Sequence, residues 1–253
     1  MKVLLHLNFI GTRYCGYQVQ PNGITVQQRL NEATKALFGY DCDVVGCSRT
    51  DSGVHANEFC VAISKSGTNF LDTTVPVDKI PLALSHLLPD DISVFAAESV
   101  EDSFHPRYDV EYKEYIYQIW NHPIRNPFWH DRAWHCPKEI SDADICRMND
   151  AAGTLIGKMD FASYMAANSK ITDTVRTIME AEVTKQNALI TFRVCADGFL
   201  YHMVRILTGT LVDVAYGRLQ AFDIPSITAA RNRCLAGPTA PAHGLYLNRV
   251  VYR

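Results

Sequence analysis

The order of strand-like and helix-like segments in the first hundred residues is the feature that most narrows the possible folds. Apolar residues alternate where a strand is predicted, and recur every three to four positions where a helix is predicted. The predicted order is strand, helix, strand, strand, helix, strand, over residues 3–9, 26–38, 43–47, 58–64, 77–88 and 92–97. This β-α-β-β-α-β order is typical of the ferredoxin-like unit, whose two helices pack on one face of a four-stranded antiparallel sheet.

The second half of the chain repeats this order with one additional helix, but without residue-level similarity to the first half. Its elements are predicted over residues 111–120, 141–156, 175–184, 188–196, 200–216, 222–235 and 245–252. A segment that contains Pro106, residues 104–110, separates the two sets. We therefore expect an α+β fold with two ferredoxin-like subdomains, residues 1–105 and 106–253, whose antiparallel sheets flank a central cleft.

Charge and cysteine usage limit the classes of protein that fit. The chain carries 24 Lys and Arg against 27 Asp and Glu, a formal net charge of −3, so a polyanion partner must meet a local basic patch. Its eight cysteines form no CxxC pair and several lie in apolar runs, which is typical of a reducing cytoplasm. The start lacks the apolar core of a signal peptide, and no stretch approaches the length of a membrane span. We expect a cytoplasmic protein without membrane contact.

A loop between two predicted strands is a candidate site. Residues 46–56 read GCSRTDSGVHA, which places Arg49 and Asp51 between Gly46 and Gly53. Glycines allow backbone angles that other residues resist, so we expect Gly46 and Gly53 to hold the carboxylate in an unusual but fixed position. The alternative is a plain hairpin loop in which Arg49 and Asp51 pair in solvent.

Two further segments combine cations with aromatic or apolar residues. Lys113, Tyr115 and Tyr117 share one face of a predicted strand, where tyrosine rings either stack on nucleobases or simply pack as a ladder. Arg205 interrupts an apolar helix, near one helical face with His202 and Gly209. A cation in such a place needs an acid, and either Asp51 or another carboxylate fits.

The nine histidines do not indicate a metal centre. The nearest cluster is His122, His130 and His135-Cys136, and its spacing fits neither an HExxH helix nor a Cys2His2 pattern. No P-loop, GxGxxG or GxSxG sequence is present, which argues against nucleotide cofactors and a serine nucleophile. We expect no cofactor and no metal.

Four motifs together resemble the TruA family of tRNA pseudouridine synthases. Residues 49–56 closely match the active-site signature of that family. Three more segments agree in order and spacing: Phe104-His-Pro-Arg107 with Lys113-x-Tyr115-x-Tyr117, then Phe199-x-Tyr-His202-Met-Val-Arg205, and finally residues 240–247, APAHGLYL. The resemblance spans nearly the whole chain.

The resemblance implies a homodimer that converts uridine to pseudouridine at positions 38–40 of the tRNA anticodon stem-loop, without cofactor or metal. By the same resemblance Asp51 is the catalytic carboxylate, and Arg205 keeps it ionised and oriented. Arg49 then fills the space left by the flipped nucleotide, because a stacked base hides its glycosidic bond. Tyr115 stacks on the uracil with Tyr117 behind it. Further substrate contacts are expected from Leu245, Arg13, Arg107, Lys113 and His202.

Two other readings remain open at this stage. A protein that binds RNA without catalysis would keep the fold, but it has no need of an ionised carboxylate beside Arg49 and Arg205. A pseudouridine synthase that acts on another RNA would share every motif quoted above. In either case we expect a basic cleft despite the net charge, with Arg125, Arg132 and Arg218 as additional phosphate contacts.

Overall fold

Residues 1–167 and 171–253 are described by a computed structural model, in which the chain divides into two compact units. The first unit comprises Met1–Glu111 and Leu247–Arg253, and the second comprises Tyr112–Tyr246. Both units combine antiparallel strands with helices, which confirms the mixed α and β character that the sequence predicts. No helix in the described ranges is both long and apolar enough to cross a membrane.

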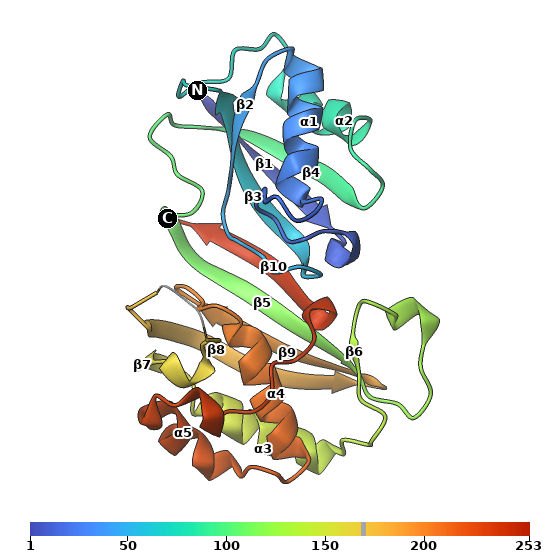
Figure 1. Ribbon diagram of the computed structural model, residues 1–253, viewed down its shortest axis with the longest axis vertical. Coiled ribbons are helices and arrows are strands. Elements are labelled where there is room, and N and C mark those ends of the chain that lie inside the picture. Colours follow the sequence, from blue (N-terminus) through green and yellow to red (C-terminus); the bar gives the residue numbers. More distant parts are fainter. Residues whose placement is uncertain (168–170) are drawn as a thin grey trace. The chain divides into compact units, whose positions relative to one another are not determined.

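The sheet of the first unit is centred on β1 (Lys2–Phe9) and β3 (His55–Lys65), which pair antiparallel. β4 (Ile92–Val100) pairs with the other edge of β1, and β2 (Cys42–Gly46) pairs with β3. β10 (Leu245–Tyr252) is also a neighbour of β3. The strand order in this unit is therefore β4-β1-β3, with β2 and β10 both beyond β3 (Figure 1).

Helices α1 (Val26–Phe38) and α2 (Ile80–Ser85) contact each other and cover one face of this sheet (Figure 1). The bounds of α1 are those predicted, because the Thr25 side chain accepts a hydrogen bond from the Gln28 backbone N–H and Gly39 ends the helix at φ +77°. Helix α2 is shorter than predicted: residues 77–79 form a 3₁₀ turn before it, and after Ser85 the chain continues as a turn toward Pro89.

The sheet of the second unit runs in the order β5-β9-β8-β7. It consists of β5 (Val110–Trp120), β9 (Leu189–Ala196), β8 (Val175–Gln186) and β7 (Gly157–Asp160), paired antiparallel throughout. A short strand, β6 (Trp134–His135), pairs parallel to β5. The sequence analysis missed β6 and β7, because two and four residues are too few to show a strand period.

Three helices belong to the second unit: α3 (Asp142–Gly153), α4 (Met203–Ala215) and α5 (Ile224–Ala230). Helix α3 begins with the capping box formed by Ser141 and Asp144, and it packs against α4 and β8. Nearly every residue of α4 is buried, as expected for a helix that is apolar on all sides.

Two helix ends in this unit differ from the prediction for the same physical reason. Helix α4 begins at Met203 and not at residue 200, because His202 has a left-handed φ of +60°. Helix α5 ends at Ala230 and not at residue 235, because Arg231 has φ +50°. A single left-handed residue stops α-helical hydrogen bonding, and neither His nor Arg announces that conformation in a sequence.

The side chain of Asn121 joins three backbone groups where the chain leaves β5. Its Nδ2 donates to the carbonyl oxygens of Cys136 (2.9 Å) and Lys138 (2.7 Å), and its Oδ1 accepts from the Ile140 N–H at 2.9 Å. Asn121 is 7% exposed, so water cannot readily replace these partners. This one side chain fixes the path of residues 136–140 into α3.

We predict that Asn121→Ala lowers the free energy of unfolding by about 3 kcal/mol, because three buried backbone groups lose their partner. Urea denaturation followed by circular dichroism measures the loss. The matched control is Asn22→Ala, at an exposed loop position, which should change stability by less than about 0.5 kcal/mol. Equal effects of the two substitutions would contradict the structural role of Asn121.

Candidate active site

Asp51 lies in the loop of residues 47–54, which links β2 to β3. Asp51 is half-buried, and its carbonyl oxygen accepts a hydrogen bond from the Val54 N–H at 3.2 Å. Within that turn Gly53 has a φ of +81°, a conformation that residues with a Cβ atom resist. The prediction that Gly53 permits an unusual backbone path beside Asp51 is confirmed.

Gly46 has another role than the one predicted. It ends β2 without a positive φ, so the expectation of a special backbone angle there is wrong. A Cβ atom on Gly46 would lie 2.5 Å from Cε1 of Tyr17, whose ring stacks on Phe59 with 4.4 Å between centroids. Gly46 is therefore required by the close approach of a buried aromatic ring.

The Asp51 loop is fixed by backbone contacts with the loop that follows β1. The Gly53 N–H (3.3 Å) and the Ser52 hydroxyl (3.2 Å) both donate to the carbonyl oxygen of Tyr14. Gly16 has φ +79°, and a Cβ there would lie 2.3 Å from the Thr50 carbonyl oxygen. The two loops therefore fit together without room for a larger residue at position 16.

His55, the first residue of β3, holds the end of the Asp51 loop that leads into this strand. Its Nδ1 accepts a hydrogen bond from the Gly11 N–H at 2.9 Å, and the residue is 1% exposed. This bond assigns the proton of a neutral ring to Nε2. The anchoring role of His55 is not evident from the sequence, where His55 is only part of the motif of residues 49–56, because Gly11 is 44 residues away in the chain.

Arg13, a predicted substrate contact, is held by an acid. Its Nε lies 2.8 Å and its Nη2 lies 2.6 Å from Oδ2 of Asp91, and the Tyr14 hydroxyl donates to Oδ1 of the same carboxylate at 2.5 Å. The Arg13 side chain is nevertheless 71% exposed, so solvent screens this pair and it contributes little to stability. Asp91 instead determines where the exposed guanidinium is presented.

Arg49 and Arg107 are the remaining predicted site residues of the first unit. Both are exposed. Arg49 lies two residues before Asp51 in the same loop, and the Arg107 N–H donates to Nδ1 of His105 at 3.1 Å. The structure thus brings Asp51 and Arg49 together in one loop and places Tyr14, the neighbour of Arg13, directly against it.

Tyr115 and Lys113 lie on β5 in the second unit, two residues apart and on the same face. Tyr115 is 7% exposed, and its ring meets Phe199 edge to face with 4.9 Å between centroids. Lys113 is half-buried and pairs in register with Ala196 of β9. The Tyr115 ring is therefore positioned by Phe199, a residue of another predicted motif.

Tyr117 is a packing residue, as predicted. It is fully buried, its hydroxyl donates to the Pro241 carbonyl oxygen at 2.7 Å, and a Cβ on Gly244 would lie 2.6 Å from its ring. Burial raises the pKa of the Tyr117 hydroxyl, while the nearby Arg205 acts in the opposite direction. Tyr117 thus connects β5 with the motif of residues 240–247.

Arg205 belongs to the first turns of α4 and is half-buried. Its Nε donates to the Ala240 carbonyl oxygen at 2.8 Å, and the Ala240 N–H donates to the Arg205 carbonyl oxygen at 3.1 Å. These reciprocal bonds fix one end of the guanidinium. The predicted pairing of Arg205 with Asp51 stays a prediction.

His202 and Leu245 complete the predicted residues of the second unit. His202 lies just before α4, so the prediction that it shares a helical face with Arg205 is wrong. The left-handed φ of His202 turns the chain into the helix instead, and its ring lies 3.9 Å from that of Tyr201. Leu245 begins β10 and is 6% exposed.

The second unit also contains a cavity of about 710 Å³ that the sequence analysis did not identify. Three tryptophan side chains contribute to its lining, together with cationic and titratable groups. These residues are Trp120, Trp129, Trp134, Arg125, His130 and His243. Burial lowers the pKa of His243 against the opposing influence of Asp131, so this ring favours its neutral form. The aromatic rings suit stacking on a planar ligand, while Arg125 and Asp131 place charges of both signs in the lining.

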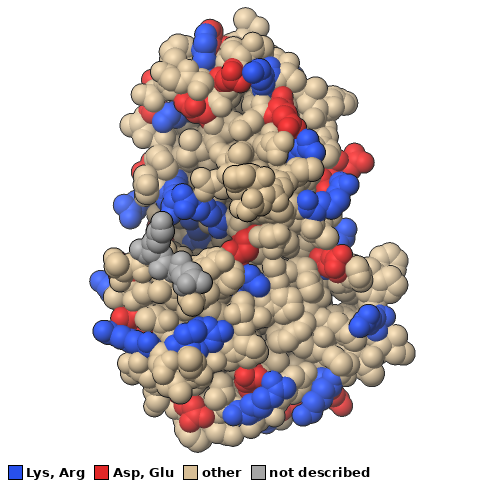
Figure 2. Space-filling model, viewed as in Figure 1, with Lys and Arg blue, Asp and Glu red and all other residues tan. Residues whose placement is uncertain are grey.

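The face shown in Figure 2 carries both acidic and basic side chains, and several of the basic ones gather in one group. The net charge of −3 follows from the composition, 24 Lys and Arg against 27 Asp and Glu. The basic cleft expected from the sequence remains a prediction.

Comparisons with known proteins agree with the four motifs. A family model described as tRNA pseudouridine synthase matches residues 151–253. A protein of Bacillus pumilus named tRNA pseudouridine synthase A is 43% identical over 256 residues, covering 100% of this chain and 99% of that protein. A protein with the same name from Thermoanaerobacter sp. strain X514 is 39% identical over 250 residues, covering 99% of each.

Among solved structures, one match is a chain in a crystal structure of a Cbf5-Nop10-Gar1 complex. Its TM-score is 0.39 at 11% sequence identity, and the match covers 97% of this chain and 48% of the other.

The contact between Gly16 and Thr50 gives a test of how the Asp51 loop is held. We predict that Gly16→Ala lowers the free energy of unfolding by about 3 kcal/mol, because it adds a steric clash to the strain of a positive φ. The control is Gly67→Ala: Gly67 also has a positive φ, of +75°, but a Cβ there meets nothing within 4 Å.

Gly67→Ala should therefore lower the free energy of unfolding by about 1 kcal/mol, the contribution of backbone strain alone. Chemical denaturation of both variants gives the difference between the two sites. If the two substitutions cost the same, the close packing of the loops at Gly16 does not contribute to stability.

Proposed function

We propose that this chain, which belongs to the tRNA pseudouridine synthase A family and is therefore an isomerase, acts on positions 38–40 of the tRNA anticodon stem-loop with Asp51 as its catalytic carboxylate. The observation that carries the assignment to Asp51 is its setting. It is a half-buried acid in a short loop whose backbone is tied to the Tyr14 carbonyl oxygen and to Gly11 through His55.

The reaction makes clear why a fixed carboxylate is useful. Pseudouridine forms when the bond between ribose C1′ and uracil N1 breaks and a bond between C1′ and C5 replaces it. The C5 proton is lost and N1 gains a proton, so the reaction needs no net reactant. A carboxylate can attack the ribose carbon, attack the uracil ring, or assist removal of a proton from the sugar, and each role requires Asp51 to be held in a defined position.

The neighbouring Arg49 suits a role in opening the RNA. A nucleotide within a stem must leave its stack before its glycosidic bond is accessible, which costs a few kcal/mol. Arg49 is exposed and lies on the same loop as Asp51, so it can occupy the vacated space while Asp51 meets the flipped nucleotide.

Residues of the second unit would bind and orient the flipped base. Tyr115, whose ring is held by Phe199, would stack on the uracil, a contact worth about 1–3 kcal/mol per base. Leu245 would line the same pocket. Arg205 has its Nε fixed on the Ala240 carbonyl oxygen, and we propose that its guanidinium orients the Asp51 carboxylate.

Contacts to the RNA backbone would come from Arg13, Arg107, Lys113 and His202. Asp91 presents the exposed Arg13 guanidinium in a defined position, so little side-chain freedom is lost when a phosphate binds. The tryptophan-lined cavity with Arg125 offers a second surface on which unpaired bases can stack. Binding through several cations will weaken steeply as salt rises.

We also propose the finer architecture that the sequence suggests. The first unit has the element order β1-α1-β2-β3-α2-β4 and the strand order β4-β1-β3-β2, which suits a ferredoxin-like subdomain of residues 1–105. The second subdomain, residues 106–253, needs β10 as its last strand. A cytoplasmic homodimer that acts without cofactor in the reaction completes the proposal, and light scattering of the purified chain measures its mass.

We predict that Asp51→Asn and Asp51→Ala lower pseudouridine formation by about 10³-fold or more, because the reacting carboxylate is lost. The assay incubates each variant with unmodified tRNA and maps pseudouridine along the transcript. Affinity for the tRNA should change by less than about threefold, since the substitution removes a negative charge and no RNA-binding cation. Asp78→Asn, an exposed acid beside Lys79, is the control and should keep full activity. Unchanged product formation by either Asp51 variant would rule out the catalytic role.

A separate prediction concerns Arg205. Arg205→Ala should lower the single-turnover rate by about 100-fold and tRNA affinity by much less, because Arg205 orients a reacting group and does not hold phosphate. Arg147→Ala, which removes a cation paired with Asp144, is the control. If Arg205→Ala weakens only tRNA binding, Arg205 contacts the RNA backbone instead.

A further inference from the structure

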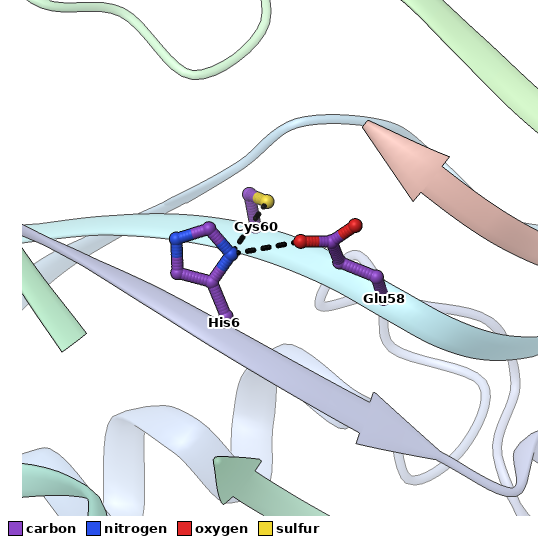
Figure 3. Close-up of side chains that lie close together, drawn as sticks. All are labelled: His6, Glu58 and Cys60. Atoms are coloured by element: carbon purple, nitrogen blue, oxygen red, sulfur yellow. Dashed lines mark hydrogen bonds and ion pairs between the residues drawn. The ribbon is translucent and has the colours of Figure 1, made fainter. Parts of the chain in front are cut away.

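A group of three potential metal ligands lies on the sheet of the first unit, outside the proposed active site. His6 is on β1, and Glu58 and Cys60 are two residues apart on β3 (Figure 3). Residues i and i+2 of a strand point to the same face, and His6 is the register partner of Cys60 across the ladder. The strand pairing therefore brings together an imidazole, a carboxylate and a thiol from two distant segments.

The two distances from His6 Nδ1 to the other ligand atoms are close to those of a tetrahedral zinc site. His6 Nδ1 lies 3.0 Å from Glu58 Oε1 and 3.6 Å from Cys60 Sγ, and the three ligand atoms all lie within 4.8 Å of one another. Bonds of about 2.0–2.1 Å to nitrogen and oxygen and about 2.3 Å to sulfur, at tetrahedral angles, give separations of about 3.3 Å for N···O and about 3.6 Å for N···S. Little movement is needed to enclose a metal ion.

The other nitrogen of His6 has the partner that zinc-bound histidines usually have. Its Nε2 lies 3.1 Å from Oε1 of Glu98 on β4. A carboxylate at that position can accept a hydrogen bond from the Nε2 proton, and in that tautomer the lone pair of Nδ1 faces Glu58 and Cys60. In this tautomer two electron-pair donors face each other at 3.0 Å, an arrangement that a shared cation stabilises.

We propose that His6 Nδ1, the Glu58 carboxylate and Cys60 Sγ bind one Zn²⁺, with water as the fourth ligand. Mixed nitrogen, oxygen and sulfur ligands favour zinc over magnesium or calcium, which prefer oxygen alone. The site is open enough for exchange with solvent, since the side chains of His6 and Glu58 are 19% and 25% exposed while Cys60 is fully buried. Phe95, whose ring lies 6.1 Å from that of His6, adds an apolar neighbour.

Binding would displace the thiol proton. Burial raises the pKa of Cys60, so the metal must replace that proton as it binds, and this lowers its net affinity. The bound ion would link β1 directly to β3 through Glu58 and Cys60, which lie near the start of β3. Its expected effect is on the stability of the first unit, because the uridine isomerisation proposed above balances without a metal.

A different arrangement of the same side chains makes the proposal testable. With His6 protonated, the ring would form ion pairs with Glu58 and Glu98 and leave no lone pair for a metal. In that case Cys60 would be a buried thiol without a ligand role. The two arrangements predict different results. Only the proposed site binds one zinc ion per chain, and only there does the Cys60 sulfur bind the metal.

The experiment uses the full-length chain, stripped with a chelator and dialysed against zinc chloride. We expect one Zn²⁺ per chain by elemental analysis and a rise in melting temperature with zinc. Replacement of zinc by Co²⁺ should give the charge-transfer absorption of a thiolate bound to cobalt. Cys60→Ser should remove that absorption, and Glu98→Gln should weaken zinc affinity about 10–100-fold. Cys234→Ser, at an exposed cysteine elsewhere, should leave both properties unchanged.

Substoichiometric zinc, no shift in melting temperature, or a cobalt spectrum without the thiolate band would each overturn the proposal. If Cys60→Ser does not fold, as judged by circular dichroism, His6→Asn provides the second variant, which keeps a polar side chain but removes the imidazole. One zinc per chain that persists in folded His6→Asn would place the metal elsewhere and likewise reject the site.

Discussion

The antiparallel ladder between β1 and β3 is the constraint on which the first unit depends. It runs from Val3 opposite Ile63 to Leu7 opposite Phe59, and shifts register before Phe9 meets Ala56. Because antiparallel pairing brings the end of one strand to the start of the other, the loop after β1 and the Asp51 loop before β3 meet at one end of the sheet. The shift is a bulge at that end, where the ladder gives way to loop contacts.

The same ladder serves two purposes with different chemistry. At its loop end, hydrogen bonds to the Tyr14 carbonyl oxygen and the close contact at Gly16 hold the loop that carries Asp51. Farther along, His6 meets Glu58 and Cys60 across the strands, where a zinc ion would reinforce the pairing. Two cations are positioned through their own side chains: Arg13 by Asp91 and Arg205 by the Ala240 carbonyl oxygen. Groups positioned in this way lose little conformational entropy when a substrate binds.

The periodicity of apolar residues predicted the long helices and strands well and the short ones poorly. The bounds of α1 follow from its capping residue Thr25 and its stop at Gly39, both visible in the sequence. The true start of α4 depends on the left-handed conformation of His202, which tertiary packing imposes on an ordinary residue type. The prediction for Gly46 was wrong for a related reason. A glycine is needed there because the ring of Tyr17 leaves no room for a Cβ atom, and not because of the backbone angles of Gly46.

The sequence alone was sufficient for the order of the longer elements, the motif of residues 49–56 and the family to which they belong, because periodicity and short motifs are properties of neighbouring residues. The anchoring of that motif by Tyr14, Gly11 and His55 became visible only in the fold. So did the meeting of His6 with Glu58, 52 residues later in the chain. Both depend on strand register, which is set by long-range pairing and core packing and leaves no trace in local spacing.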